Sequence, residues 1–159
     1  MTFQFDPLTE TATLADCETA IASAFPAVPE ITASELYVRL AANAPTLLLD
    51  VREEAEHAVS HIRGSVVALP GVSAAAVLTT HNPTAGTTIV CACSVGLRSA
   101  RMAALLRDAG WVSVANLRGG IFRWALNGRP LETFGRPTTK VHPFDDRWGR
   151  LLKIPCKPG

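Results

Sequence analysis

The chain has 159 residues, of which 48% are hydrophobic and 18% are charged, and its formal net charge is +1. This length fits one domain with a hydrophobic core and argues against two. No apolar run reaches the roughly 18 to 20 residues that span a bilayer, so a membrane partner is not expected. The opening MTFQFDPLTE lacks the basic and apolar segments of a secretory signal, which predicts a cytoplasmic protein.

Charge is segregated at the two ends of the chain. Residues 1–29 hold four acids and no Lys or Arg, residues 136–159 hold six bases and two acids, and the middle is nearly balanced. Pro and Gly interrupt the pattern at 25–30 and at 134–140. We therefore predict an N-terminal acidic extension (1–29), one domain (30–135) and a basic C-terminal extension (136–159). The basic end is too weak a signal to predict nucleic-acid binding.

Helix-like and strand-like segments alternate along the chain. Residues 13–25 are a candidate helix, and Thr32 with Glu35 forms a capping box for a helix that runs to about Leu40. Further helices are expected at 52–60, at 99–110 with Gly110 as its C-terminal cap, and from Gly119-Gly120 to Gly128. Short apolar runs typical of buried parallel strands lie at 46–51, 65–70, 87–92 and 111–117. This alternation predicts an α/β fold with a mostly parallel central sheet flanked by helices on both faces.

The four cysteines differ in their sequence surroundings. Cys17, Cys91, Cys93 and Cys156 are irregularly spaced, which is not the pattern of a disulfide framework. Cys91 lies inside an apolar run and is expected in the core. Cys93 follows directly, at the carboxyl end of the predicted strand, where parallel sheets bind their ligands. A metal site made of Cys91, Cys93 and His57 or His61 lacks a second ligand pair, so neither a metal nor another cofactor is predicted.

The loop CSVGLRS (93–99) joins a strand to a helix. The inward-pointing amides of a tight loop and the start of the helix provide partial positive charge, which stabilises a thiolate. Gly96 permits a backbone conformation that a side chain disfavours, and Arg98 adds a full charge. Cys93 is therefore the candidate nucleophile, although a lone cysteine at a strand end is more often a small buried hydrophobe. The candidate substrate-binding residues on this loop are Ser94, Val95, Gly96, Leu97, Arg98 and Ser99.

Three segments resemble the rhodanese family of single-domain sulfurtransferases over about residues 30–131. DVREEAEHAVSHIRGS (50–65) is similar to the family's segment with Asp-Val-Arg, a following acid and His-Ile-Pro-Gly-Ala. CSVGLRSA (93–100) resembles its active-site loop, and NLRGGIFRWALNGRPLE (116–132) resembles its closing segment. The loop alone is moderately specific, whereas all three segments in order form a strong signal.

The resemblance implies a rhodanese-like α/β fold and a sulfurtransferase. Cys93 would take a sulfane sulfur from thiosulfate or a related donor, hold it as a persulfide and pass it to a thiol, a protein or cyanide. The amides from Ser94 to Ser99 would cradle the persulfide, and Arg98 would attract an anionic donor. Asp50 and Arg52 are expected to anchor neighbouring loops, and His61 to hold a turn through its ring nitrogens.

Two positions depart from the family pattern. Ser60 stands where a Gly is usual before the His, and Arg63 stands where the family has Pro. Arg63 lacks the fixed φ of proline and adds a second cation. We therefore predict that Arg63 assists donor binding.

Two other functions are weighed against sulfur transfer. Cysteine-dependent phosphatases and arsenate reductases related to this fold have five residues between Cys and Arg, whereas four intervene here, and Ala92 replaces the usual His. A non-enzymatic redox or persulfide-sensing module is the second alternative, with Cys156 as a possible partner for Cys93. The sequence leaves open the oligomeric state and whether the two extensions cover the active site, clasp each other or build a dimer.

Overall fold

A computed structural model describes residues 11–69 and 71–152 of the chain. The five parallel strands of its central sheet lie in the order β1-β5-β4-β2-β3. They are β1 (Glu30–Ile31), β2 (Thr46–Asp50), β3 (Val66–Val67), β4 (Thr88–Ala92) and β5 (Val114–Leu117). A separate antiparallel hairpin is formed by β6 (Leu131–Thr133) and β7 (Arg136–Thr138). The predicted α/β class and the parallel sheet are confirmed.

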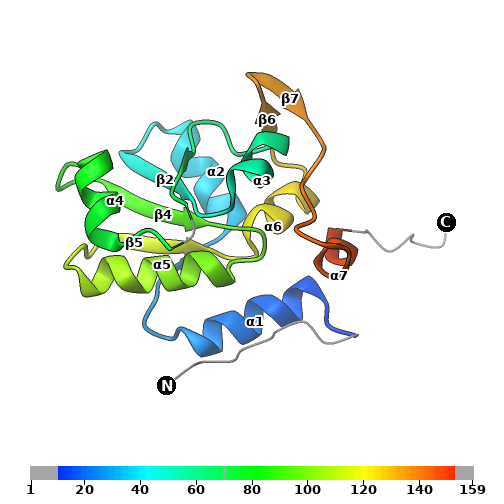
Figure 1. The fold of residues 1–159 in the computed structure, drawn as a ribbon, viewed down its shortest axis with the longest axis horizontal. Helices are drawn as coiled ribbons and strands as arrows, with labels where there is room; N and C mark the ends of the chain where they lie inside the picture. The colour runs from blue at the N-terminus through cyan, green and yellow to red at the C-terminus, as the bar shows by residue number, and fades with distance from the viewer. Residues whose placement is uncertain (1–10, 70, 153–159) are drawn as a thin grey trace.

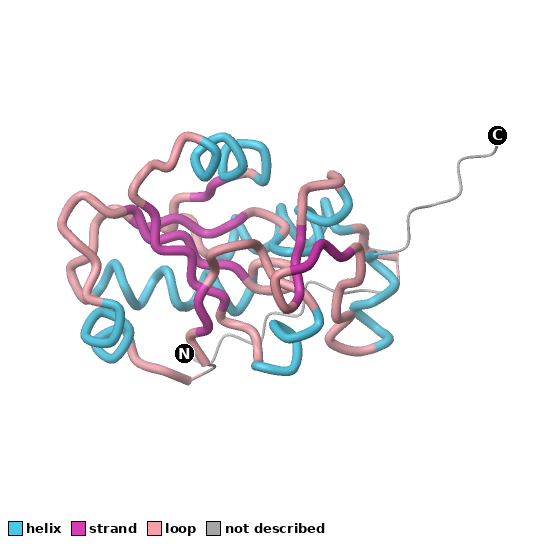
Figure 2. Tube along the Cα trace, turned by 90° about the horizontal axis from the view of Figure 1, so that it is seen from above, coloured by secondary structure: helices cyan, strands magenta, loops and turns pink. Residues whose placement is uncertain are grey.

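Helices cover both faces of the sheet (Figures 1 and 2). They are α1 (Leu14–Ala24), α2 (Ala33–Ala41), α3 (Glu54–Val59), α4 (Ala74–His81), α5 (Leu97–Asp108), α6 (Gly120–Leu126) and α7 (Asp146–Gly149), followed by the short 3-10 helix η1 (Arg150–Leu152). Side chains of α4 and α5 share one hydrophobic cluster with β2 and β4, and side chains of α2 and α6 share the other. Helices are therefore packed on both sides of the central strand.

The alternation of side chains along β4 sets the direction in which each cysteine points. Ile89, Cys91 and Cys93 belong to the cluster under α4 and α5, whereas Val90 and Ala92 belong to the cluster over α2 and α6. This is the period of two that a strand requires. Because Cys93 is the first residue after the strand, it keeps this direction while its backbone already enters the loop.

Several elements differ from the sequence-based expectation. The predicted buried strand at 65–70 is the two-residue β3 at the edge of the sheet, where it is only half-buried. The strand expected at 111–117 begins only at Val114, as β5. Gly110 follows the end of α5 in a left-handed conformation, and residues 111–113 connect it to β5. Helix α4 and the β6-β7 hairpin were not predicted: the run Ala74–His81 is almost uniformly small or apolar and has no clear helical stripe.

Both charged extensions contribute structure that packs on the domain. Leu14, Cys17 and Ile21 of α1 share a buried cluster with Val95 of the loop and Leu151 of η1. Arg150 donates to the carbonyl of Ala12 at 2.9 Å, so the two extensions touch. Glu18, however, pairs with Arg123 at 2.5 Å and with Arg118 at 3.8 Å, both in the domain. The charge of Glu18 is thus matched by two arginines of the domain.

Within residues 11–69 and 71–152, no helix has both the length and the apolar character that crossing a bilayer requires.

Candidate active site

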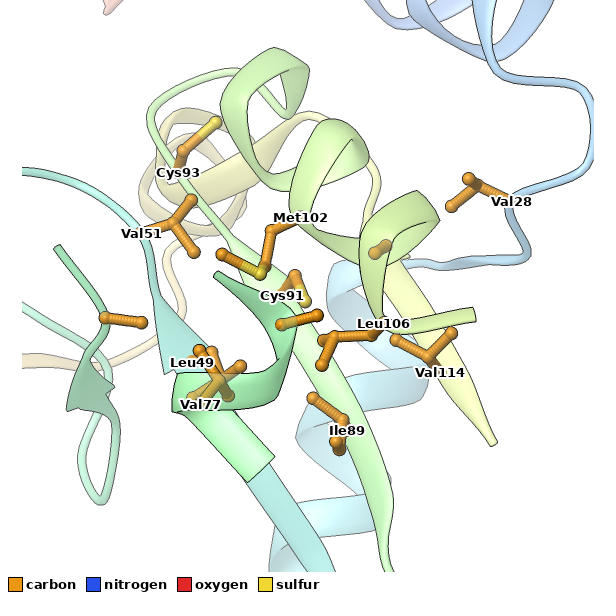
Figure 3. Close-up of a cluster of buried hydrophobic side chains, with 13 residues drawn as sticks. Val28, Leu49, Val51, Val77, Ile89, Cys91, Cys93, Met102, Leu106 and Val114 are labelled. Atoms are coloured by element: carbon orange, nitrogen blue, oxygen red, sulfur yellow. The ribbon is translucent and has the colours of Figure 1, made fainter. Parts of the chain in front are cut away.

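Cys93 lies where the central strand β4 ends, beside the first turn of α5. Figure 3 shows its sulfur directed toward that turn and away from Cys91 and Met102. The residue is 1% exposed, yet it borders a cavity of about 130 Å³. The cavity is lined by Cys93, Ser94, Val95, Leu97, Arg98, Phe144 and Trp148. The thiol is therefore covered from bulk solvent but has open space in front of it.

Two donors converge on the sulfur of Cys93. The amide of Gly96 donates to Sγ at 3.2 Å, and the hydroxyl of Ser99 lies 3.4 Å from Sγ. The first contact requires a sharp turn, in which Gly96 adopts φ 110°, a conformation that glycine adopts without a Cβ penalty. Helix α5 starts at Leu97, so its unpaired first-turn amides add partial positive charge at the same place. The surroundings favour a negatively charged sulfur.

Asn116 of β5 holds this arrangement in place. Ser99 Oγ donates to Asn116 Oδ1 at 2.6 Å, and Asn116 Nδ2 donates to the carbonyl of Gly96 at 3.0 Å. A hydroxyl has one proton, so Ser99 donates either to Asn116 or to the sulfur of Cys93 at a given moment. Asn116 is 1% exposed and connects two points of the loop through one buried side chain.

Arg98 is held by a carboxylate from another element. Its Nη1 and Nη2 donate to the two carboxylate oxygens of Glu56 in α3, both at 2.9 Å, and Nη2 also donates to Ser94 Oγ at 2.9 Å. Burial opposes ionisation of Glu56, but the hydrogen bonds and charge of Arg98 outweigh it and hold the pKa of this carboxyl below its ordinary value. Burial likewise opposes charge on Arg98, and its contacts with Glu56 and Cys93 raise its pKa. Both groups are charged at neutral pH.

Replacing Glu56 with glutamine is expected to destabilise the protein by about 2 kcal/mol at pH 7, because Arg98 then loses a charge-assisted bidentate partner. The pKa of Glu56 is lowered in the folded state, so its contribution is full above the ordinary value of 4.5 and is lost as the pH falls through the lower folded value. The difference in unfolding free energy between wild type and E56Q should therefore shrink in acid. Urea unfolding at several pH values measures it.

Glu54 on the same helix is the matched control for this prediction. It is exposed, so Glu54→Gln should change the unfolding free energy by less than about 0.5 kcal/mol. Equal losses in E54Q and E56Q, or a loss in E56Q that does not shrink as the pH falls below 4.5, would contradict the importance of the Glu56–Arg98 pair.

Asp50 and Arg52 form a second, fully buried ion pair. Arg52 Nη2 lies 2.7 Å from Asp50 Oδ2 and donates to the carbonyl of Ser60 at 2.7 Å. The pair thus ties the end of β2 to the end of α3, as expected for an anchoring role. His61 also holds a turn as predicted, because its Nδ1 lies 3.0 Å from the carbonyl of His57 and its Nε2 lies 3.6 Å from Glu132.

The start of α6 supports the other side of the loop. The amides of Ile121 and Phe122 donate to the carbonyls of Cys93 and Ser94 at 2.9 and 3.0 Å. Gly120 has φ 59°, and a Cβ built on it would lie 2.3 Å from the Cys93 carbonyl oxygen. Because the two backbone segments approach so closely, there is no room for a side chain at position 120.

The structure brings most of the predicted site residues together. Cys93, Ser94, Val95, Leu97 and Arg98 line one cavity, and Gly96 and Ser99 contact the sulfur. Arg63 lies in an exposed turn before β3 and is not among the residues lining this cavity, so its role in donor binding stays a prediction. Cys91 is buried as expected, and burial together with the neighbouring Cys93 raises the pKa of its thiol. Cys156 lies outside the described residues.

Sequence reasoning did not identify Glu56, Asn116, Phe144 and Trp148 as members of the site. Glu56 could have been suspected, because an acid follows Asp-Val-Arg in the segment 50–65 that resembles the rhodanese family. Asn116 could also have been suspected, because it is a polar residue within an otherwise apolar strand. Phe144 and Trp148 come from the C-terminal extension, for which covering the active site had been one open alternative. Among residues 11–69 and 71–152, no group of three or more His, Cys, Asp or Glu side chains is placed to hold a metal ion.

Together, the parallel sheet and the loop at the carboxyl end of its central strand define an α/β domain built around one cysteine. A family model described as a rhodanese-like domain matches residues 32–127. The chain belongs to this rhodanese-like family.

Similar proteins agree with that placement. A sulfurtransferase from Allochromatium vinosum is 36% identical over 104 residues, which cover 65% of this chain and 94% of that protein. A thiosulfate sulfurtransferase structure from Pseudomonas aeruginosa is similar with a TM-score of 0.65 and 26% identity, over 73% of this chain but 22% of that longer one. A human single-domain sulfurtransferase shares the fold, with a TM-score of 0.51 and 24% identity over 61% of this chain and 95% of its own.

Proposed function

We propose that the protein is a sulfurtransferase that carries a sulfane sulfur on Cys93. The observation that supports this most directly is the pair of donors on Cys93 Sγ, the Gly96 amide at 3.2 Å and the Ser99 hydroxyl at 3.4 Å, beside a cavity of about 130 Å³. The donors stabilise a thiolate, and the cavity leaves room for a second sulfur atom. The names of the Allochromatium vinosum and Pseudomonas aeruginosa relatives point to the same class of reaction.

The reaction has two half-steps. The thiolate of Cys93 attacks the outer sulfur of the donor, a new S–S bond forms at Sγ, and the donor leaves with the electron pair of its broken bond. With thiosulfate the leaving group is sulfite. A thiolate or cyanide then attacks the terminal sulfur of the Cys93 persulfide and restores the thiolate of Cys93. The amides of the loop and of the first turn of α5 stabilise the negative charge of the persulfide.

Intact-mass measurement tests this function directly. Incubation with thiosulfate or a related donor, followed by removal of the donor, should add the mass of one sulfur atom, and peptide mapping should place that sulfur on Cys93. Cyanide should then remove the sulfur and release thiocyanate. A protein that gains no sulfur from any sulfane donor, or gains it on another cysteine, would contradict the proposal.

The same measurement distinguishes the non-enzymatic alternative. A redox or persulfide-sensing module would convert the loaded Cys93 into a stable disulfide with Cys156 and would show no repeated turnover with cyanide. Phosphatase chemistry is less favoured because Arg98, the cation of the loop, is already paired with Glu56 rather than available to a phosphate. Hydrolysis of an aryl phosphate by the purified protein would revive that alternative.

A further inference from the structure

The C-terminal extension forms part of the wall of the Cys93 cavity. Phe144 and Trp148 line it together with residues of the loop, and Cys93 itself is 1% exposed. A donor that occupies the cavity would therefore lie beside these two aromatic rings. Figure 1 shows α7 of this extension beside the loop that leads into α5.

The cavity wall is largely apolar. Four of the lining residues, Val95, Leu97, Phe144 and Trp148, have hydrophobic side chains. The volume of about 130 Å³ is close to the roughly 150 Å³ of an apolar cavity in another protein that binds benzene. The space beside the sulfur therefore suits a hydrocarbon group as well as a small anion.

The arginine that lines the cavity is already paired with a carboxylate. Arg98 is the charged residue among those that line it, and both of its terminal nitrogens donate to Glu56. Its guanidinium also lies 5.0 Å from the centroid of the Phe144 ring. The guanidinium of Arg147 lies 5.9 Å from the centroid of the Trp148 ring. Arg98 therefore shares its charge with Glu56, which weakens its attraction for the second negative charge of a dianion that must leave water to enter the cavity.

Phe144 is held in place at a conformational cost. It has φ 69°, a left-handed conformation that is rare for an aromatic residue, and its amide donates to His142 Nδ1 at 2.9 Å. Such strain persists where surrounding contacts determine the conformation, and it often occurs at functional positions. Phe144 is 46% exposed, and the inner side of its ring faces the guanidinium of Arg98 at the cavity.

We propose that Phe144 and Trp148 make the site selective for organic, singly charged sulfane donors with an apolar group over the thiosulfate dianion. This inference rests on the proposed sulfur transfer at Cys93 and defines its donor class. For a thiosulfonate, the thiolate of Cys93 attacks the outer sulfur, the S–S bond to the sulfonyl sulfur breaks, and a sulfinate leaves with the electron pair. For an organic persulfide, the same attack releases a thiolate. The apolar group of either donor packs against the two rings.

Three donors separate charge from apolar contact. Thiosulfate is a dianion without an organic group, methanethiosulfonate is a monoanion with a methyl group, and benzenethiosulfonate is a monoanion with a ring. Rates of sulfur loading on Cys93, each divided by the rate of the same donor with a free thiol, should rise in that order. Phe144→Ala should lower the benzene-to-methane ratio about fivefold, as expected for the loss of one ring contact. Phe144→Leu, which keeps apolar bulk, should lower it less.

Phe134→Ala is the matched control for Phe144→Ala. Phe134 is 90% exposed, also has a positive φ, and lies in the turn of the β6-β7 hairpin rather than at this cavity. Its replacement should leave the benzene-to-methane ratio unchanged. If thiosulfate loads fastest after normalisation, or if Phe144→Ala and Phe134→Ala give the same ratio, the donor selectivity is wrong although sulfur transfer stands. If no donor loads Cys93, sulfur transfer itself fails, and the selectivity fails with it.

Discussion

Replacing Cys93 with serine should abolish sulfur loading and lower turnover with any sulfane donor by about a thousandfold or more. A serine hydroxyl is un-ionised at neutral pH, and its oxygen does not form the persulfide on which the second half-step depends. The fold should survive, because the Gly96 amide and Ser99 hydroxyl that contact Sγ can also hydrogen-bond to an oxygen. Circular dichroism would verify the fold, and thiocyanate formation would measure turnover.

Cys91→Ala is the control for Cys93→Ser. Cys91 lies two residues earlier, within β4, belongs to the same hydrophobic cluster as Cys93 and is completely buried. Its replacement should cost about 1 to 2 kcal/mol of stability through the lost packing of one sulfur, while the folded protein keeps its sulfur loading. Undiminished turnover in C93S would show that another thiol carries the sulfur and would refute the assignment of Cys93.

The sheet was predictable because its strands obey local rules. The apolar runs at 46–51 and 87–92 match β2 and β4 closely, and the capping box of Thr32 and Glu35 is present as predicted. Two-residue strands such as β1 and β3 carry too little sequence pattern, since their pairing depends on the neighbouring strand. Helix α4 was missed for a related reason, because a small and apolar run has no stripe to distinguish buried from exposed faces.

The site was predictable only where it is local in sequence. Cys93, Gly96 and Arg98 lie within six residues, so a strand followed by a loop and a helix was enough to indicate an anion-binding turn. Glu56 and Asn116 reach the same loop from elements 42 and 17 residues away from their partners. No local rule gives such contacts. Arg98 therefore looked like an available cation in the sequence, whereas in the fold its charge is paired.

This difference changes how the loop stabilises a bound sulfur. The loop amides and the full charge of Arg98 were both expected to stabilise the sulfur, and in the fold Arg98 also donates to Glu56 and Ser94. The backbone amides of the loop and of the first turn of α5 therefore carry a larger share of the stabilisation of a negative sulfur than they would beside an unpaired Arg98. Amides are effective only when the backbone is fixed, so the elements that hold the loop carry part of its function. The start of α6 is one of these elements.

Replacing Gly120 with alanine is expected to cost about 3 kcal/mol or more of stability and to lower sulfur loading about a hundredfold. The added Cβ would lie 2.3 Å from the carbonyl oxygen of Cys93 and 2.5 Å from that of Ser94, both backbone atoms. The contact can be relieved only by moving α6 away from the loop, which breaks the hydrogen bonds from Ile121 and Phe122. Urea unfolding and loading rates of the folded protein measure the two effects.

Gly128→Ala is the control for Gly120→Ala. It measures the cost of placing alanine in a left-handed conformation without the backbone contact that Gly120 makes. Gly128 has φ 71°, similar to the 59° of Gly120, but a Cβ built on it would meet no atom within 4 Å. Its replacement should cost about 1 to 2 kcal/mol and leave the loading rate unchanged, because the strain lies away from the loop. If the two alanine variants lost equal stability and loaded sulfur equally fast, the α6 contact would not position Cys93, and the cradle around its sulfur would have to be maintained by Asn116 and α5 alone.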